Sequence, residues 1–179
     1  MLCAIMQPTF LPWMGYFSMM SKVDLFVYFD DVQLAKRSWQ VRNRIKGQNG
    51  EFFLNIPIKK TVTRDELLIC EAVIDDEQGW RQKHLTSMLH AYKKAPFFES
   101  VYPFLEDIYA KKTTKLSEFT IFAIESIKVA IGIETRSVLA SVLDGIEGQK
   151  DERLVSICKK VIRSTLASYH LHHFYRLQQ

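Results

Sequence analysis

One stretch decides the fold: residues 2–29 read LCAIMQPTFLPWMGYFSMMSKVDLFVYF. The apolar run of residues 2–6 predicts a buried strand, and the prolines and glycine of residues 7–15 predict a loop after it. Beyond the loop, apolar residues at i, i+3, i+4 and i+7 predict one face of a short helix: Tyr16, Met19, Met20 and Val23. Residues 25–29 form a second apolar run. This order predicts a βαβ unit with parallel strands and a right-handed crossover.

The rest of the chain continues with a hairpin and then mainly with helices. The turn dipeptide Asn49-Gly50 predicts a hairpin between residues 41–46 and 51–58. Residues 67–74 and 136–143 are two further candidate strands. Four helices are predicted after the hairpin. The first is capped by Asp75 to Glu77 and ends before Pro96, and the second has Pro103 in its first turn. The third runs from Ser117 to Gly132, and the fourth includes residues 154–161. The fold class is therefore α/β, with a mainly parallel or mixed sheet and a helical second half.

Length and composition indicate one globular domain. The 179 residues divide into a strand-rich, ligand-binding half at 1–75, a mainly helical half at 76–163 and a tail at 164–179. A chain that is 47% hydrophobic and 25% charged is typical of a soluble protein, and no apolar run approaches the roughly 18 residues of a membrane span. No signal-peptide pattern begins the chain, so we expect a cytoplasmic location. Three scattered cysteines suit buried thiols in a reducing compartment.

Ligand-binding residues are expected where the two strands of the βαβ unit end, at residues 7–16 and 30–33. The chain then becomes basic around Trp39, with five cations within eleven positions: Lys36, Arg37, Arg42, Arg44 and Lys46. Arginine can bind phosphate through two parallel hydrogen bonds, which favours an anion site, whereas a solvated charged face is the alternative. Outside this stretch the chain, whose net charge is +4, is close to neutral, which argues against a nucleic-acid partner.

Two acids and one histidine are the catalytic candidates. Asp30 and Asp31 follow the second strand and could hold a ribose hydroxyl, a metal ion or the neighbouring arginines. His84 could be a general base or a phosphate ligand, and a hydrogen-bonded structural histidine is the alternative. His90 lies six residues from His84 on the same predicted helix, so the two point in different directions. No metal site is predicted, because the histidines of the tail, His170, His172 and His173, lack a partnering Cys or Asp nearby.

The loop from Thr9 to Tyr16 is similar to that of nucleotidyltransferases of the HxGH type, which bind a nucleotide between the first strand and helix. Trp13 and Tyr16 stand where that family has its two histidines, and neither supplies an imidazolium. The comparison therefore favours a nucleotidyltransferase-like α/β fold that lacks the histidine-dependent stabilisation of the transferred phosphate. Trp13 and Tyr16 would suit stacking against a base or a sugar, and burial in the core is the alternative.

A larger set of residues points to one family. In the first quarter the matching residues are Gln7 to Phe17, Asp24, Phe26-Val27, Asp30 to Gln33, Lys36 to Ser38, Arg42 to Lys46 and Gly50. Weaker matches are Leu54, Ile56 to Ile58, Trp80, His84, Tyr92 to Phe98 and Arg153-Leu154. In these residues the chain resembles the WbqC-like family of bacterial proteins. Family members commonly end in a segment with Ser-Gly and further glycines, whereas residues 161–179 contain none, so a site that needs the tail would be incomplete here.

The resemblance implies a place in bacterial surface polysaccharide biosynthesis, including O-antigen and lipopolysaccharide, and a transferase that moves glycine or another acyl group onto a nucleotide-linked amino sugar. The expected ligand is an anionic small molecule such as a nucleotide sugar, and no cofactor other than a nucleotide-activated donor is identified. Gln7, Thr9, Trp13, Gly15 and Tyr16 are expected to shape the pocket, and Lys36, Arg37, Arg42 and Arg44 to hold phosphate. A non-catalytic nucleotide- or partner-binding protein is the alternative, and a homo-oligomer is compatible with either.

Overall fold

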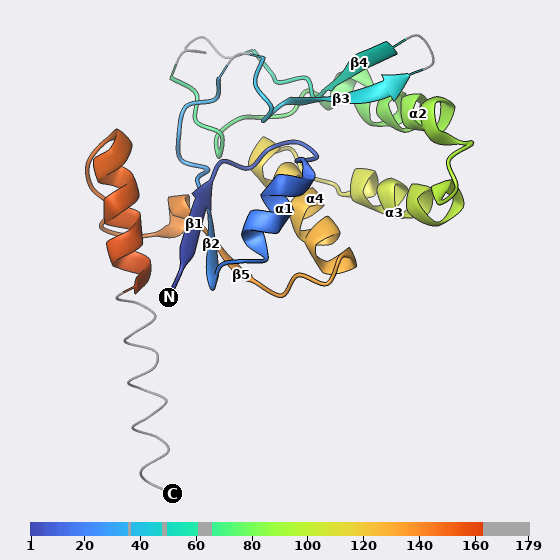
Figure 1. Ribbon diagram of the computed structural model, residues 1–179. Coiled ribbons are helices and arrows are strands. Elements are labelled where there is room, and N and C mark those ends of the chain that lie inside the picture. The colour runs from blue at the N-terminus through green and yellow to red at the C-terminus, as the bar shows by residue number, and fades with distance from the viewer. Residues whose placement is uncertain (36, 48–49, 61–65, 163–179) are drawn as a thin grey trace, which may run out of the picture.

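The computed structural model describes residues 1–35, 37–47, 50–60 and 66–162. Its central element is a parallel sheet in which β1 (Cys3–Met6), β2 (Leu25–Tyr28) and β5 (Arg136–Leu139) lie in the order β1-β2-β5 (Figure 1). Helix α1 (Met14–Met20) joins β1 to β2 and confirms the predicted βαβ unit. Met6 lies opposite Tyr28, and Tyr28 lies opposite Leu139, so all three strands end at one edge of the sheet.

The predicted hairpin is confirmed, as β3 (Arg42–Gly47) paired antiparallel with β4 (Gly50–Asn55). Ile45 and Leu54 are buried, whereas Arg44 and its cross-strand partner Phe53 lie on the exposed face, as the alternation of side chains along a strand requires. The backbone N–H of Lys46 donates to the hydroxyl of Tyr92 at 3.0 Å, which ties one end of the hairpin to the following helix.

Helices make up most of the second half of the chain. They are α2 (Trp80–Tyr92), α3 (Phe98–Ala110), α4 (Leu116–Ala130) and the helix of residues 150–162. Two short 3-10 segments, η1 (Asp76–Gln78) and η2 (Ala140–Val142), follow the hairpin region and β5. The predicted end of α4 is confirmed, because Gly132 has φ +74 just beyond it. In the described part of the chain, none of the helices is long and apolar enough to cross a membrane.

The predicted strand at residues 67–74 is wrong. Leu68, Val73 and Ile74 form only isolated bridges to three different segments, so the alternation arises from a turning segment whose residues Ile69, Ala72 and Ile74 enter the core. Residues 136–143 form a strand only as far as Leu139.

Two helix starts also differ from the predictions. The acids at Asp75–Glu77 precede α2 without making a side-chain cap; instead, the Asp76 carboxylate accepts hydrogen bonds from the Trp80 and Arg81 side chains. Pro103 lies inside α3 rather than in its first turn. The helix begins at Phe98, where Phe98 and Tyr102, four residues apart, stack with ring centroids 4.8 Å apart, a favourable contact within a helix.

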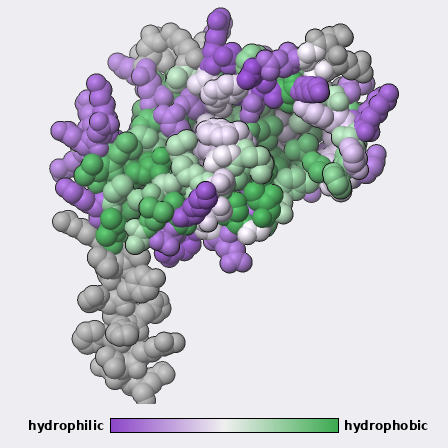
Figure 2. Space-filling model, viewed as in Figure 1, coloured by the Kyte–Doolittle hydropathy of each residue, from purple (hydrophilic) through white to green (hydrophobic). Residues whose placement is uncertain are grey.

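The sheet separates two apolar layers. Phe26 and Tyr28 of β2 pack with α1 and with Ile124 of α4, whereas Val27 faces Ile157 and Val161 of the helix of residues 150–162. Figure 1 shows that helix on the side of the sheet away from α1 and α4. A third cluster, around Phe10, Trp80 and Phe119, joins the hairpin to α2, α3 and α4. On the face shown in Figure 2, hydrophilic side chains gather above, over the hairpin and loops, and apolar ones below, over the sheet and α1.

Candidate functional site

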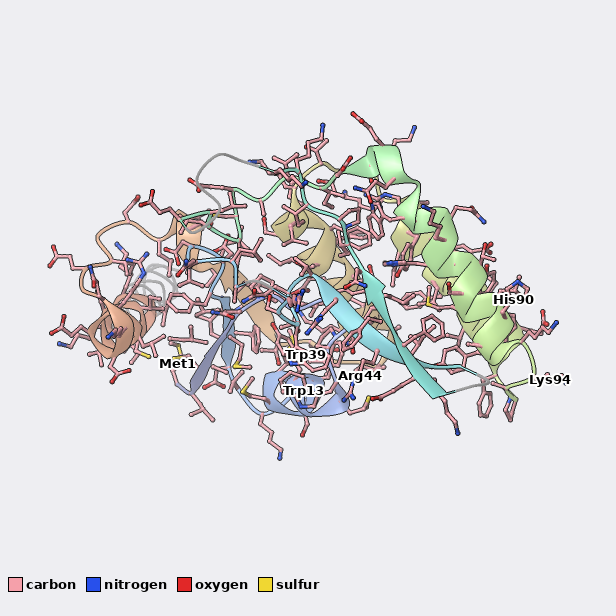
Figure 3. The ribbon with its side chains drawn as sticks, turned by 90° about the horizontal axis from the view of Figure 1, so that it is seen from above. Met1, Trp13, Trp39, Arg44, His90 and Lys94 are labelled. Carbon is pink, nitrogen blue, oxygen red and sulfur yellow. The ribbon has the colours of Figure 1, made fainter. Side chains whose placement is uncertain are left out.

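The loop after β1 and the β3–β4 hairpin enclose a groove of about 560 Å³. Its lining residues come from these two segments and the turn before β3: Thr9, Phe10, Pro12, Trp13, Trp39, Asn43, Arg44 and Glu51. Figure 3 shows Trp13, Trp39 and Arg44 grouped together, far from His90 and Lys94 at the end of α2. The groove lies where β1 ends and α1 begins, which is one of the two positions predicted for a ligand.

Direct hydrogen bonds join the two walls of the groove. The Asn43 side chain donates from Nδ2 to the carbonyl oxygens of Phe10, at 3.0 Å, and Leu11, at 2.5 Å. The Phe10 N–H donates to the carbonyl oxygen of Trp39 at 2.9 Å. These hydrogen bonds connect the loop and the hairpin directly, so the two walls of the groove belong to one packed unit.

Two exposed tryptophans flank the groove. Trp13 is 59% exposed and Trp39 is 48% exposed, although both are large apolar side chains that normally find cover in the core. Trp13 packs edge-on against Tyr16, with ring centroids 5.9 Å apart, and the Tyr16 ring is fully buried beneath it. Gly15 belongs to this arrangement, because a Cβ atom at this position would overlap the Trp13 indole.

Arginines and aromatic rings alternate on the exposed face of the hairpin beside the groove. The Arg44 guanidinium carbon lies 5.6 Å from the Trp39 ring, and that of Arg42 lies 4.3 Å from the Phe53 ring. Trp39 and Phe53 have ring centroids 6.3 Å apart. Arg44 also forms an ion pair with Glu51, from Nη1 to Oε1 at 2.5 Å, and both partners are about half exposed. The face therefore offers cations and aromatic surfaces side by side.

The groove brings together three of the predicted residues: Thr9, Trp13 and Arg44. The Thr9 hydroxyl oxygen is buried and has no hydrogen-bond partner within the described residues. Because a buried hydroxyl without a partner is destabilising, its position favours a ligand that supplies the missing hydrogen bond.

The other predicted pocket and phosphate residues do not line the groove. Gln7 accepts a hydrogen bond from the Gln40 side chain, and its carbonyl oxygen accepts one from the Tyr16 hydroxyl at 3.2 Å. Tyr16 has no exposed surface and can act only by supporting Trp13. Arg37 is exposed, with φ +54, in the turn before the hairpin. Lys36 lies outside the described residues.

Asp30 and Asp31 bind other parts of the fold, and not the arginines of the hairpin. Asp30 is 1% exposed and accepts hydrogen bonds from the backbone N–H of Ser141, at 3.0 Å, and from its hydroxyl, at 2.6 Å. Asp31 forms an ion pair with Arg153 on the helix of residues 150–162. The two carboxylates thus fix η2 and this last helix to the end of β2.

His84 is placed as a structural residue. It is 5% exposed; its Nε2 donates to the carbonyl oxygen of Asn55 at 3.1 Å, and its Nδ1 accepts from the Tyr109 hydroxyl at 3.1 Å. Burial lowers the pKa of His84 to about 4, so the imidazole is neutral at pH 7. The geometry supports the structural alternative, because the ring joins α2 to the end of β4 and does not reach the groove.

Sequence reasoning missed the contribution of Asn43 and Glu51 to the groove. A signal for Glu51 was available, because a hairpin closed at residues 47–50 places it diagonally opposite Arg44. No local signal pointed to Asn43, whose partners lie more than 30 positions earlier. No group of three or more metal-ligating side chains occurs among the residues that the structure describes, and His170, His172 and His173 fall outside them.

A second hollow, of about 650 Å³, lies between α2 and the end of α3. Arg81, one of the cations that line it, already contacts Asp76 and the carbonyl oxygens of Tyr109 and Thr113. Since these contacts are all structural, the groove beside Trp13 and Trp39 is the better candidate for a ligand site.

Comparison with known proteins identifies the same family that the sequence motifs resemble. The WbqC-like protein family matches residues 7–173, which includes most of the stretch 161–179 that departs from the family pattern. The uncharacterized protein Rv1507c of Mycobacterium tuberculosis is 31% identical over 166 residues, which cover 92% of this chain and 71% of that protein. No solved structure matches the chain. The match over nearly the whole length shows that the chain belongs to the WbqC-like protein family.

Proposed function

We propose that this protein is a transferase of bacterial surface polysaccharide assembly and that its groove holds the sugar of a nucleotide-activated donor. One observation carries the proposal: Trp13 and Trp39 flank a single groove with much of their ring surface uncovered. Aromatic faces suit the apolar C–H faces of a sugar or the face of a base. A volume of about 560 Å³ falls within the range of small-molecule sites.

The polar groups of the groove are those that such a ligand needs. The Thr9 hydroxyl has no partner in the described structure and can bond to a sugar hydroxyl. Arg42 and Arg44 lie beside the aromatic rings, where a diphosphate joined to a stacked base or sugar would reach them. Because the Arg44–Glu51 ion pair is exposed, it contributes little stability, and Arg44 can exchange Glu51 for phosphate at small cost.

Transfer of glycine or another acyl group onto an amino sugar is the finer form of the proposal, and the family resemblance supports it. The described lining residues include no cysteine or histidine, so catalysis would rest on positioning and on charge. The same observation favours one alternative, a non-catalytic protein that binds a nucleotide sugar in the same groove. Measurement of turnover separates the two, because a binding protein retains affinity for the ligand without forming product.

A binding experiment with matched variants tests the groove. Purified protein is titrated calorimetrically with nucleotide sugars, amino-sugar nucleotides and free nucleotides at fixed salt. Trp13→Ala and Arg44→Ala should each weaken binding of the best ligand by about tenfold or more, equivalent to ~1.4 kcal/mol, with little change in Tm. Met14→Ala is the control, because Met14 is 75% exposed next to Trp13 but does not line the groove. Equal affinity in all three variants would exclude the groove as the site.

A further inference from the structure

The side chains of two of the three cysteines are in contact where β1 faces the helix of residues 150–162. Cys3 begins β1, Cys158 lies on the helix of residues 150–162, and their Sγ atoms are 3.6 Å apart. The residues are 155 positions apart in the chain, so the fold alone brings them together. Both side chains are half-buried, which leaves them accessible to a small reagent.

Well-packed contacts on either side of Cys158 hold its sulfur at this position. Ile157 and Val161 of the same helix are buried against Val27 and Ala140. One turn earlier, Arg153 forms its ion pair with Asp31 at the end of β2. Figure 1 shows this helix running beside β1, so the approach of the two sulfurs follows from docking of the whole helix.

We propose that Cys3 and Cys158 form a reversible intramolecular disulfide when the protein meets a low-molecular-weight disulfide such as oxidised glutathione. A disulfide bond is about 2.05 Å long, so formation of the bond requires the sulfurs to approach by roughly 1.5 Å through rotation of the two side chains. The product would join β1 covalently to the last helix of the described chain.

The chemistry is thiol–disulfide exchange in two steps. One cysteine thiolate attacks a sulfur of the oxidant, which forms a mixed disulfide and releases one glutathione thiolate. The second cysteine, after losing its proton, attacks the protein sulfur of that mixed disulfide and expels the second glutathione. The two cysteines lose two electrons and two protons in total, and one oxidised glutathione becomes two reduced molecules.

The surroundings indicate a slow reaction. Burial, together with the hydrogen bond between the two thiols, raises the pKa of Cys3 to about 11, so this thiol is protonated at neutral pH. Only the thiolate reacts, and the pair therefore responds to sustained oxidation rather than to a brief pulse of oxidant. Cys70 provides an internal reference, because its thiol is half-buried on a different segment, where its N–H bonds to the Asp30 carbonyl oxygen.

Thiol counting tests the proposal on the full chain. The protein is incubated with millimolar oxidised glutathione, quenched with N-ethylmaleimide, and its intact mass and proteolytic peptides are measured. Reduced protein should take up three maleimides and oxidised protein one, with a peptide crosslink between Cys3 and Cys158. The oxidised protein should also show a Tm higher by on the order of 5 °C, reversed by dithiothreitol.

Variants make the outcome decisive. Cys70→Ser should still lose both of its remaining thiols on oxidation. Cys3→Ser should instead retain its thiols or carry a glutathione adduct, without the rise in Tm, and Cys158→Ser repeats this test from the other side. Three maleimides on the oxidised wild-type protein, or a crosslink that involves Cys70 or joins two molecules, would overturn the proposal.

Discussion

Acid is expected to destabilise this protein through one buried side chain, His84. Its pKa is lowered from 6.5 to about 4 because the ring is desolvated. Between these values the unfolded chain binds a proton at His84 that the folded chain does not, so the free energy of unfolding rises with pH. The contribution is complete above pH 6.5 and is lost as the pH falls towards 4. At 1.36 kcal/mol per pKa unit, lowering the pKa from 6.5 to about 4 corresponds to about 3 kcal/mol.

Urea-induced unfolding, followed from about pH 5 to pH 8, measures this contribution as a slope. Below about pH 6 the wild-type free energy of unfolding should fall by roughly 1.4 kcal/mol per pH unit from His84 alone. His84→Gln retains an amide donor for the Asn55 carbonyl oxygen; it should be less stable at neutral pH but lack this part of the slope. The difference between wild type and variant removes the contribution of all other titrating groups.

His90→Gln is the matched control, since His90 is an exposed histidine of the same helix. It should keep the wild-type slope. Wild-type and His84→Gln proteins with the same slope would refute the reasoning, because His84 would then titrate alike in the folded and unfolded chains.

Three further predictions concern other contacts. Gly15→Ala should displace the Trp13 indole and weaken ligand binding with little change in Tm, whereas Gly145→Ala, at a position with open space but φ +72, should reduce Tm without affecting binding. Glu125→Ala removes the acceptor for Tyr28 and for Lys128, which is 7% exposed; the free energy of unfolding in urea should fall by about 3 kcal/mol. Glu51→Gln breaks only the exposed ion pair with Arg44, and its urea midpoint should correspond to a loss below about 1 kcal/mol.

The parts of the fold that depend on local pattern could be predicted from the sequence. The βαβ unit follows from two short apolar runs around one amphipathic turn, and the hairpin follows from Asn49-Gly50. Residues 67–74 show the limit of this reasoning, because the same alternation suits a strand and a turning segment that enters the core. Only the presence or absence of a neighbouring strand distinguishes them, and that depends on distant residues.

The candidate site was predictable as a region and not as a set of residues. The loop after β1 was recognised from its prolines, its glycine and its place after a strand. The sequence did not indicate which aromatic ring of the loop reaches solvent. Tyr16 is buried against Phe17 and Phe26, whereas Trp13, three residues earlier, is exposed. The ion-pair partner of Asp31 could not be predicted either, since Arg153 is 122 positions away in the sequence. Contacts of this kind follow from tertiary packing.

The two attachments of the hairpin to α2 have a mechanical consequence. His84 holds the Asn55 end and Tyr92 holds the Lys46 end, eight residues apart on one helix, or about 12 Å along its axis. Because both ends of the hairpin are hydrogen-bonded to the same helix, the hairpin is expected to move together with α2. Protonation of His84 would remove the acceptor for the Tyr109 hydroxyl, but the Nε2–H group would still donate to the Asn55 carbonyl oxygen. The hairpin is therefore expected to stay attached to α2 at both ends as the pH falls, until the chain itself unfolds.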